Sequence, residues 1–282
     1  MHDIRLIDEA FDIKKLSGYH LSIQAGLDGF SYTIFDPSKF KYIVLKHYGF
    51  GDEIPEFKYQ DSLKKLLNED EFLQKEFQSI YCIWNNPRTT LLPGVLFEKE
   101  KIRQYFEFNQ ILNDPDELHA TQIKSLDAYL IFPVHHEIAN VFIRQYPALK
   151  FFNQASSFIE HIMHNHAGNN DAAYLNIHKG FFDMLIIRNK SLVLHNTFNY
   201  RNENDIAYFV MNVYDKVSLD PARIPIYISG SVEKNSDKIN RLRSFIKTIR
   251  FSTQDGRFQY SYTFDRIPEH WFVTLFNLYF CG

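Results

Sequence analysis

Hydrophobic and polar positions follow the same pattern along two stretches of the chain, Tyr19–Lys46 and Ala173–Phe198. Each stretch holds three short apolar or alternating runs, which are typical of β-strands, and tight turn signals separate the runs. Each stretch is followed by the pattern of an amphipathic helix, which in the second half carries Ile206, Val210 and Val213 on one face. The sequence therefore predicts a strand–strand–strand–helix unit that occurs twice.

Turn residues indicate the limits of these elements. Gly26-Leu27-Asp28-Gly29 separates the first two runs and is a glycine-containing loop of hairpin length. Arg188-Asn189-Lys190 suits a tight turn before the last run of the second stretch, and Ala167–Asp171 is the clearest linker in the chain. We therefore expect two lobes, residues 1–166 and 167–282.

Further elements follow each repeated unit. Leu126–Pro133 predicts a buried strand, and helical patterns cover His135–Gln145 and Asn153–His166. The polar, turn-rich segment Asn113–Thr121 predicts an exposed loop. A final apolar helix is expected to start at Pro268 and to be buried in the second half, since it lacks the cationic face of a membrane-surface helix.

Each half thus runs strand, strand, strand, helix, strand, helix, strand, helix. The opening hairpins are antiparallel and the strands joined through helices are parallel, so mixed sheets are expected. This order resembles the actin-like ATPase superfamily, which includes sugar kinases and heat-shock chaperone ATPase domains. The resemblance covers nearly the whole chain and implies an α/β fold of two ribonuclease-H-like lobes with a cleft between them. The pattern, including the terminal LFNLYFCG, is also similar to an uncharacterised family found in Bacteroidetes, whose members have actin-like folds without an assigned reaction.

The resemblance implies where a nucleotide site would lie. In the superfamily an Asp-x-Gly ends the first strand: the aspartate holds Mg²⁺ through water, and the glycine lets the turn approach phosphate. The matching residues here are Gln24, Ala25 and Gly26. In the second half the match runs from Asn176 to Gly180, and Lys179 lies in this turn, beside the place for a phosphate. Both carboxylates are thus replaced by amides, which lack the charge that a divalent ion requires.

Two other stretches also resemble the superfamily, and the first of them is better preserved than the matches at Gln24 and Asn176. Ile226–Ser231 resembles the strand and small-residue turn that approaches the adenosine, which implies binding roles for Ser229, Gly230 and Ser231. Ile131-Phe132-Pro133 resembles the strand that closes the first half. A packed central strand followed by a tight turn gives the same pattern, so neither match is specific by itself.

These motifs favour a non-catalytic scaffold or binding protein, that is, a pseudo-ATPase without a cofactor. The nearest functional analogues are degenerate actin-like proteins that scaffold secretion and pilus assemblies. The alternative is a divergent ATPase or kinase that binds ATP in the inter-lobe cleft. A sensor of a metal or small ligand near His178 and Lys179 is a third hypothesis.

Composition excludes several other classes. A net charge of −3 gives no general attraction for nucleic acid. Cys82 and Cys281 form no CxxC pair, which argues against a disulfide framework or a cysteine-based zinc site. The acidic N-terminal residues do not suit a signal peptide, and no run reaches the ~20 apolar residues of a membrane span. We expect a cytoplasmic protein with an unidentified protein partner.

Candidate catalytic groups are few. The histidine-rich segment Glu160–His166 does not match HExxH, and no GxSxG is present for a serine nucleophile. A two-metal nuclease needs several clustered carboxylates, whereas Asp183 stands alone on its predicted strand. No metal site and no catalytic residue is therefore assigned.

Overall fold

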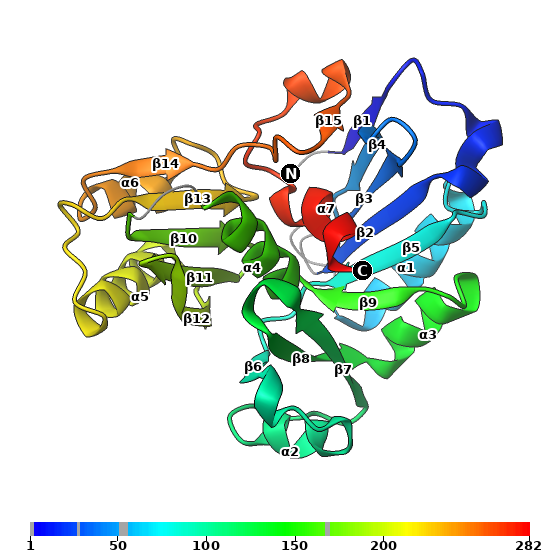
Figure 1. Cartoon of the computed structure of the whole chain (residues 1–282). Helices are drawn as coiled ribbons and strands as arrows, with labels where there is room; N and C mark the ends of the chain where they lie inside the picture. The colour runs from blue at the N-terminus through cyan, green and yellow to red at the C-terminus, as the bar shows by residue number, and fades with distance from the viewer. Residues whose placement is uncertain (1–2, 27–28, 51–55, 167–169) are drawn as a thin grey trace. The chain divides into compact units, whose positions relative to one another are not determined.

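The computed structural model describes residues 3–26, 29–50, 56–166 and 170–282 (Figure 1). Part of the predicted turn at 26–29 and most of the predicted linker at 167–171 lie outside these residues. The chain forms two compact units. The first comprises Met1–Glu160, Asp255–Ile267 and Thr274–Gly282, and the second comprises His161–Gln254 and Pro268–Val273.

The first unit is built on a seven-stranded mixed sheet with the order β1-β4-β3-β2-β5-β9, in which β15 also pairs with β4. β2, β3 and β4 form antiparallel pairs, whereas β5 is parallel to β2 and β9 is parallel to β5. The strands are β1 (Ile4–Ile7), β2 (His20–Gly26), β3 (Gly29–Asp36), β4 (Lys41–Tyr48), β5 (Ser79–Trp84), β9 (Lys150–Asn153) and β15 (Gln259–Tyr260); the helices are α1 (Glu56–Glu69), α3 (His136–Gln145) and α4 (Gln154–Asn165), of which α4 ends in the second unit.

The alternation along β2 gives this sheet two different faces. Leu21, Ile23 and Ala25 lie in one hydrophobic core with side chains of α1 and α3, including Leu63 and Phe142. The intervening side chains point to the opposite face and are polar: His20, Ser22 and Gln24. One face of the sheet is thus apolar core, whereas on the other face β2 presents polar side chains beside the aromatic rings of Phe35 and Tyr42.

A smaller antiparallel sheet with the order β6-β8-β7 belongs to the same unit: β6 (Thr90–Pro93), β7 (Asp116–Ile123) and β8 (Ala128–His135), with helix α2 (Ile102–Glu107). The prediction of an exposed loop over Asn113–Thr121 was wrong, because β7 pairs with β8 from Asp116 onward. Its polar side chains stay near solvent at the sheet edge. Ile131-Phe132-Pro133, which resemble the strand that closes the first half, lie in β8 of this smaller sheet.

The second unit repeats the arrangement with a five-stranded sheet of order β12-β11-β10-β13-β14. Asn202 caps α5 through a capping box with Asp205, which explains where this helix begins. The elements are β10 (Ala172–Ile177), β11 (Phe181–Arg188), β12 (Ser191–Asn199), α5 (Glu203–Lys216), β13 (Ile226–Gly230), α6 (Asp237–Arg243) and β14 (Ile249–Phe251). The order β10-β11-β12-α5-β13 matches β2-β3-β4-α1-β5, which confirms the duplicated unit and the mixed sheets.

The last residues of the chain differ from their prediction. The helix α7 (Val273–Asn277) starts later than Pro268 and is short, and Thr274–Gly282 belong to the first unit, although burial in the second half was expected. Aromatic side chains of β3 and β4 hold them there: the ring centroids of Tyr42 and Phe276 are 5.0 Å apart, and those of Phe35 and Tyr279 are 4.6 Å apart. The compact units therefore differ from the contiguous lobes 1–166 and 167–282. No helix in the described part of the chain has the length and apolar character that a membrane crossing requires.

Candidate functional site

Gln24 lies on the polar face of the first sheet, near the end of β2. Its Oε1 accepts a hydrogen bond from Thr274 Oγ1 at 3.0 Å. Gly26 ends the strand and pairs with Gly29 of β3. At the other end of β2, burial lowers the pKa of His20 to about 3, so its ring is neutral at physiological pH and bonds to the hydroxyls of Ser22 and Ser79. The amide oxygen of Gln24 thus has a neutral hydroxyl as its partner.

Asn176 occupies the equivalent place in the second sheet and is buried on β10. Its Oδ1 accepts a hydrogen bond from Ser229 Oγ at 3.2 Å, and its Nδ2 lies 2.7 Å from His178 Nε2. Ser229 comes from β13, which runs parallel to β10 and pairs Ser229 with Asn176 in register. Both ends of this amide are therefore engaged by neighbouring protein groups.

A buried carboxylate stands beside this amide. The hairpin register pairs Asn176 with Asp183 of β11, and Asp183 with Thr197 of β12. Thr197 Oγ1 donates to Asp183 Oδ1 at 2.7 Å, and His178 Nε2 is 3.4 Å from Asp183 Oδ2. Burial lowers the pKa of His195 on the same sheet face, against the opposite effect of Asp183, and keeps that ring neutral. Polar side chains from four strands thus converge on one face of this sheet.

The backbone N–H groups of the turn after β13 donate hydrogen bonds to neighbouring segments of the second unit. Gly230 has φ +96°, which favours glycine, and a Cβ at this position would lie 2.2 Å from the carbonyl oxygen of Ile177. The N–H of Gly230 donates to the carbonyl of His270 at 2.9 Å, and the N–H of Ser231 donates to the carbonyl of Ile177 at 3.1 Å. These two N–H groups already have protein acceptors, so they are poorly placed to bind a phosphate.

Lys179 and Gly180 form the turn between β10 and β11, and both are exposed. The His178 N–H donates to the carbonyl of Phe181 at 2.9 Å across the turn, and Gly180 adopts φ +83° with no atom near the place of a Cβ. Of the residues predicted in the second half, the structure brings Asn176 and Ser229 into direct contact, with Gly230 at the same strand end. Gln24 and Gly26 belong to the other compact unit.

Asp183 was not predicted as a site residue because it is the lone acid on its predicted strand, although it is central to this cluster. The position of the tight turn at Lys179-Gly180 would have indicated which residues pair across the hairpin. Residues equally distant from a two-residue turn face each other across a hairpin, and this rule pairs Asn176 with Asp183. Within the described ranges, no group of three His, Cys, Asp or Glu side chains could hold a metal ion. A single carboxylate among neutral groups supplies little of what a divalent ion needs.

Comparison with known protein families shows to which family this chain belongs. Residues 8–249 match the model of a family described as a protein of unknown function (DUF3822). The chain belongs to the DUF3822 family. No curated protein matches it.

Solved structures give the fold of this DUF3822 protein. A Bacteroides thetaiotaomicron VPI-5482 protein with an actin-like ATPase fold and unknown function is 22% identical, with a TM-score of 0.75 over 86% of this chain and 93% of that one. A chain of the PilM-PilN type IV pilus biogenesis complex, 9% identical, gives a TM-score of 0.59 over 92% and 97%. The ethanolamine utilization protein EutJ from Carboxydothermus hydrogenoformans, also 9% identical, gives 0.52 over 98% and 93%. The actin-like fold implied by the sequence is therefore confirmed, and identities this low carry the fold alone.

Proposed function

We propose that this protein is a non-catalytic binding protein of the cytoplasm, which uses a degenerate actin-like fold as a scaffold for a protein partner. The observation that carries the proposal is the position of Asn176 and the hydrogen bonds of its side chain. It stands where the superfamily resemblance implies a metal-binding aspartate, and both ends of its amide are engaged by His178 and Ser229. Phosphoryl transfer in such folds depends on metal ions to neutralise developing charge. Without the carboxylates of both halves, that chemistry lacks its usual parts.

Calorimetry with nucleotides tests this proposal. Purified protein titrated with ATP and with ADP, each with and without Mg²⁺, is expected to give no binding heat and no rise in melting temperature. Mg²⁺-dependent binding with a dissociation constant near 1 µM, about −8 kcal/mol, would contradict the proposal. The far-ultraviolet circular dichroism of the same sample shows whether the protein is folded.

Asp183 favours one alternative, a divergent ATPase or kinase. This buried carboxylate lies in register with Asn176 on the neighbouring strand and would be the one acid of the cluster able to replace the missing aspartate. If nucleotide does bind, Asp183→Asn should abolish the dependence on Mg²⁺ under this alternative. An unchanged Mg²⁺ dependence in Asp183→Asn would exclude a role for this carboxylate.

An apolar surface near α2 supports the choice of a protein partner. Phe108 is 91% exposed and Val95 is 88% exposed, and Leu96 and Ile111 are exposed as well. The Tyr105 hydroxyl donates to the carbonyl of Leu96 at 2.7 Å, which joins α2 to the turn that carries Val95 and Leu96. Charges of both signs accompany it in the ion pairs Lys101–Glu98 and Arg103–Glu107. Exposed apolar groups accompanied by such charges suit a partner segment with an apolar face and flanking charges of both signs.

Replacing Phe108 by serine is expected to lower the affinity for that partner by roughly 30-fold, since truncating a central aromatic side chain costs about 2 kcal/mol or more of binding free energy. The partner is isolated by affinity capture with the wild-type chain, and its affinity is then measured with purified proteins. Tyr208→Ser on α5 is the matched control, because Tyr208 is also an exposed aromatic but lies in the second unit. Equal affinity for wild type, Phe108→Ser and Tyr208→Ser would contradict this surface.

A further inference from the structure

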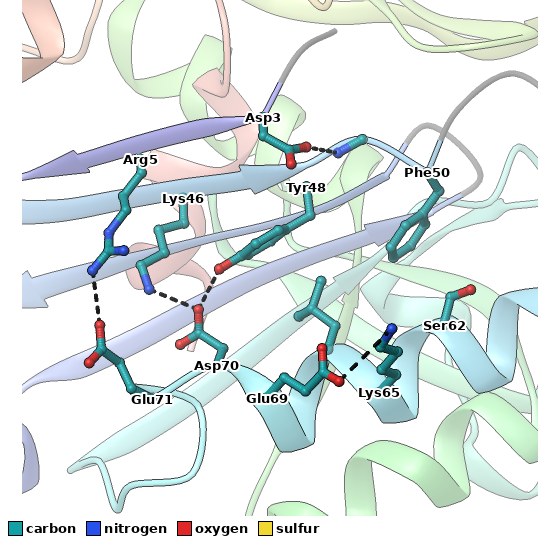
Figure 2. A pocket seen from close by; sticks show the side chains of 12 residues that line it. Asp3, Arg5, Lys46, Tyr48, Phe50, Ser62, Lys65, Glu69, Asp70 and Glu71 are labelled. Atoms are coloured by element: carbon teal, nitrogen blue, oxygen red, sulfur yellow. Dashed lines mark hydrogen bonds and ion pairs between the residues drawn. The ribbon is translucent and has the colours of Figure 1, made fainter.

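A pocket of about 580 Å³ lies in the first unit, on the side of α1 where the helix ends (Figure 2). Arg5 of β1 and Lys46 and Tyr48 of β4 form one wall, and Lys65 and Glu69 of α1 lie opposite. These residues are distinct from the polar sheet faces described above. The volume is within the range of about 300–1,000 Å³ that is common for small-molecule sites.

The base of the pocket is a buried ion pair. The side chain of Lys46 is only 4% exposed, and its Nζ lies 2.8 Å from Asp70 Oδ2. Asp70 also accepts hydrogen bonds from the hydroxyls of Tyr32 and Tyr48 and from the N–H of Phe72. Both oxygens of Asp70 are therefore well supplied with donors, and its position is fixed.

Lys46 has donor capacity beyond this pair. An ammonium group carries three N–H donors. Among the described residues, Asp70 is the one hydrogen-bond acceptor that Lys46 Nζ contacts, and the ring centroid of Phe72 lies 4.0 Å from Nζ on another side. A nearly buried cation thus lines the pocket with N–H groups to offer to an oxygen atom of a ligand.

The outer part of the pocket carries two exposed ion pairs. Arg5 and Glu71 are 3.0 Å apart, with side chains 65% and 55% exposed, and Lys65 and Glu69 are 3.9 Å apart. Exposed pairs contribute little to stability, so their partners can turn to a ligand at small cost. Figure 2 shows the Arg5–Glu71 pair at one side of the pocket and the Lys65–Glu69 pair along α1, with the ring of Phe50 above Lys65.

Charge balance indicates the kind of ligand. Three cationic and four acidic side chains line the pocket: Arg5, Lys46, Lys65, Asp3, Glu69, Asp70 and Glu71. A ligand with one sign of charge would be attracted by one of these two sets and repelled by the other. A ligand with two separated, opposite charges is matched by both sets, and Phe50 and Leu66 supply apolar surface.

We propose that this pocket binds a zwitterionic ligand with a free carboxylate and a free ammonium group, of the class of amino acids and short peptides. The carboxylate is held by Lys46 and Arg5, and the ammonium group is held by Glu69 at the end of α1. The assignment is independent of the proposed scaffold function, because it concerns a different surface of the first unit.

Four probes test the pocket by calorimetry: leucine, glycyl-leucine, N-acetyl-glycyl-leucine and glycyl-leucinamide. At least one of the two zwitterions is expected to bind with a dissociation constant of about 1 mM or lower. The two capped peptides are expected to bind at least tenfold more weakly than glycyl-leucine, or, if leucine alone binds, not at all. The comparison of leucine with glycyl-leucine distinguishes a free amino acid from a peptide. Absence of binding by both zwitterions, or equal binding of glycyl-leucine and its capped forms, would overturn the proposal.

Variants assign each charge to its end of the pocket. Arg5→Gln is expected to weaken the binding of the zwitterion and to leave the acetylated peptide with a still lower affinity. Glu69→Gln should remove the preference for ligands with a free ammonium group. Both side chains are more than half exposed, so these variants should keep the fold. Arg243→Gln on α6 is the matched control and should bind like wild type, since Arg243 lies in the second unit. Unchanged affinity in both pocket variants would overturn the assignment.

Discussion

Replacing Gly230 by alanine is expected to destabilise the protein by roughly 3–5 kcal/mol, among the largest effects of a single methyl group. Two costs add at this position. The backbone has φ +96°, which an L-residue adopts only with strain, and the new Cβ would meet the carbonyl oxygen of Ile177 at 2.2 Å and its nitrogen at 2.7 Å. These are backbone atoms of the paired strand β10, so no side chain can move aside. Urea unfolding of the variant and of wild type gives the difference in free energy.

Two other glycines separate the costs. Gly180 has φ +83° but no atom within 4 Å of the place of a Cβ, so Gly180→Ala reports the backbone strain alone, about 1–2 kcal/mol. Gly256 has neither a close neighbour nor a positive φ in the left-handed range, and Gly256→Ala is expected to change stability by less than about 0.5 kcal/mol. If Gly230→Ala cost no more than Gly180→Ala, the close approach of β13 to β10 would be contradicted.

The parts of the fold that the sequence predicts are those specified by short-range patterns. The hairpins of β2–β4 and β10–β12 follow from alternation and turn residues, and α5 follows from the period of its apolar residues. β7 was missed because a polar edge strand is stabilised by pairing with β8, a partner that local composition does not reveal. The place of Thr274–Gly282 likewise depends on aromatic contacts with β3 and β4, more than 200 residues away.

The candidate site was predictable to a similar degree. Asn176 and Ser229 were each found through the superfamily resemblance, and the parallel pairing of β10 with β13 joins them. Asp183 required the register of the hairpin as well as its existence, because a shift by one residue would turn its side chain to the opposite face. The pocket beside α1 corresponds to no motif that we recognised in the sequence. Its residues come from β1, β4 and the end of α1, and only the tertiary structure brings them together.

Replacing Lys46 by methionine is expected to destabilise the protein by about 3–5 kcal/mol at neutral pH, because Asp70 would remain buried as an unpaired anion. In the wild-type protein burial alone would raise the pKa of Asp70, but hydrogen bonds from Lys46, Tyr48 and the Phe72 N–H hold it below its ordinary value. The ionised pair therefore contributes stability above the unfolded pKa of about 3.9, and this contribution is lost as the pH falls through the lower folded pKa. Urea unfolding at a series of pH values measures both effects.

The variant should show the opposite pH dependence. Without Lys46, burial is the largest effect on the pKa of Asp70 and is expected to outweigh the hydrogen bonds from Tyr48 and the Phe72 N–H, so we expect the variant to gain stability relative to wild type as the pH falls from 7 toward about 4. Asp70→Asn in the Lys46→Met background removes the buried charge and should recover part of the loss, which a double-mutant cycle quantifies. The exposed pair supplies the control: Arg5→Met breaks the ion pair with Glu71 and should cost less than about 1 kcal/mol. Equal losses for Lys46→Met and Arg5→Met at neutral pH would mean that water reaches Asp70, and the base of the pocket would then be a solvated surface.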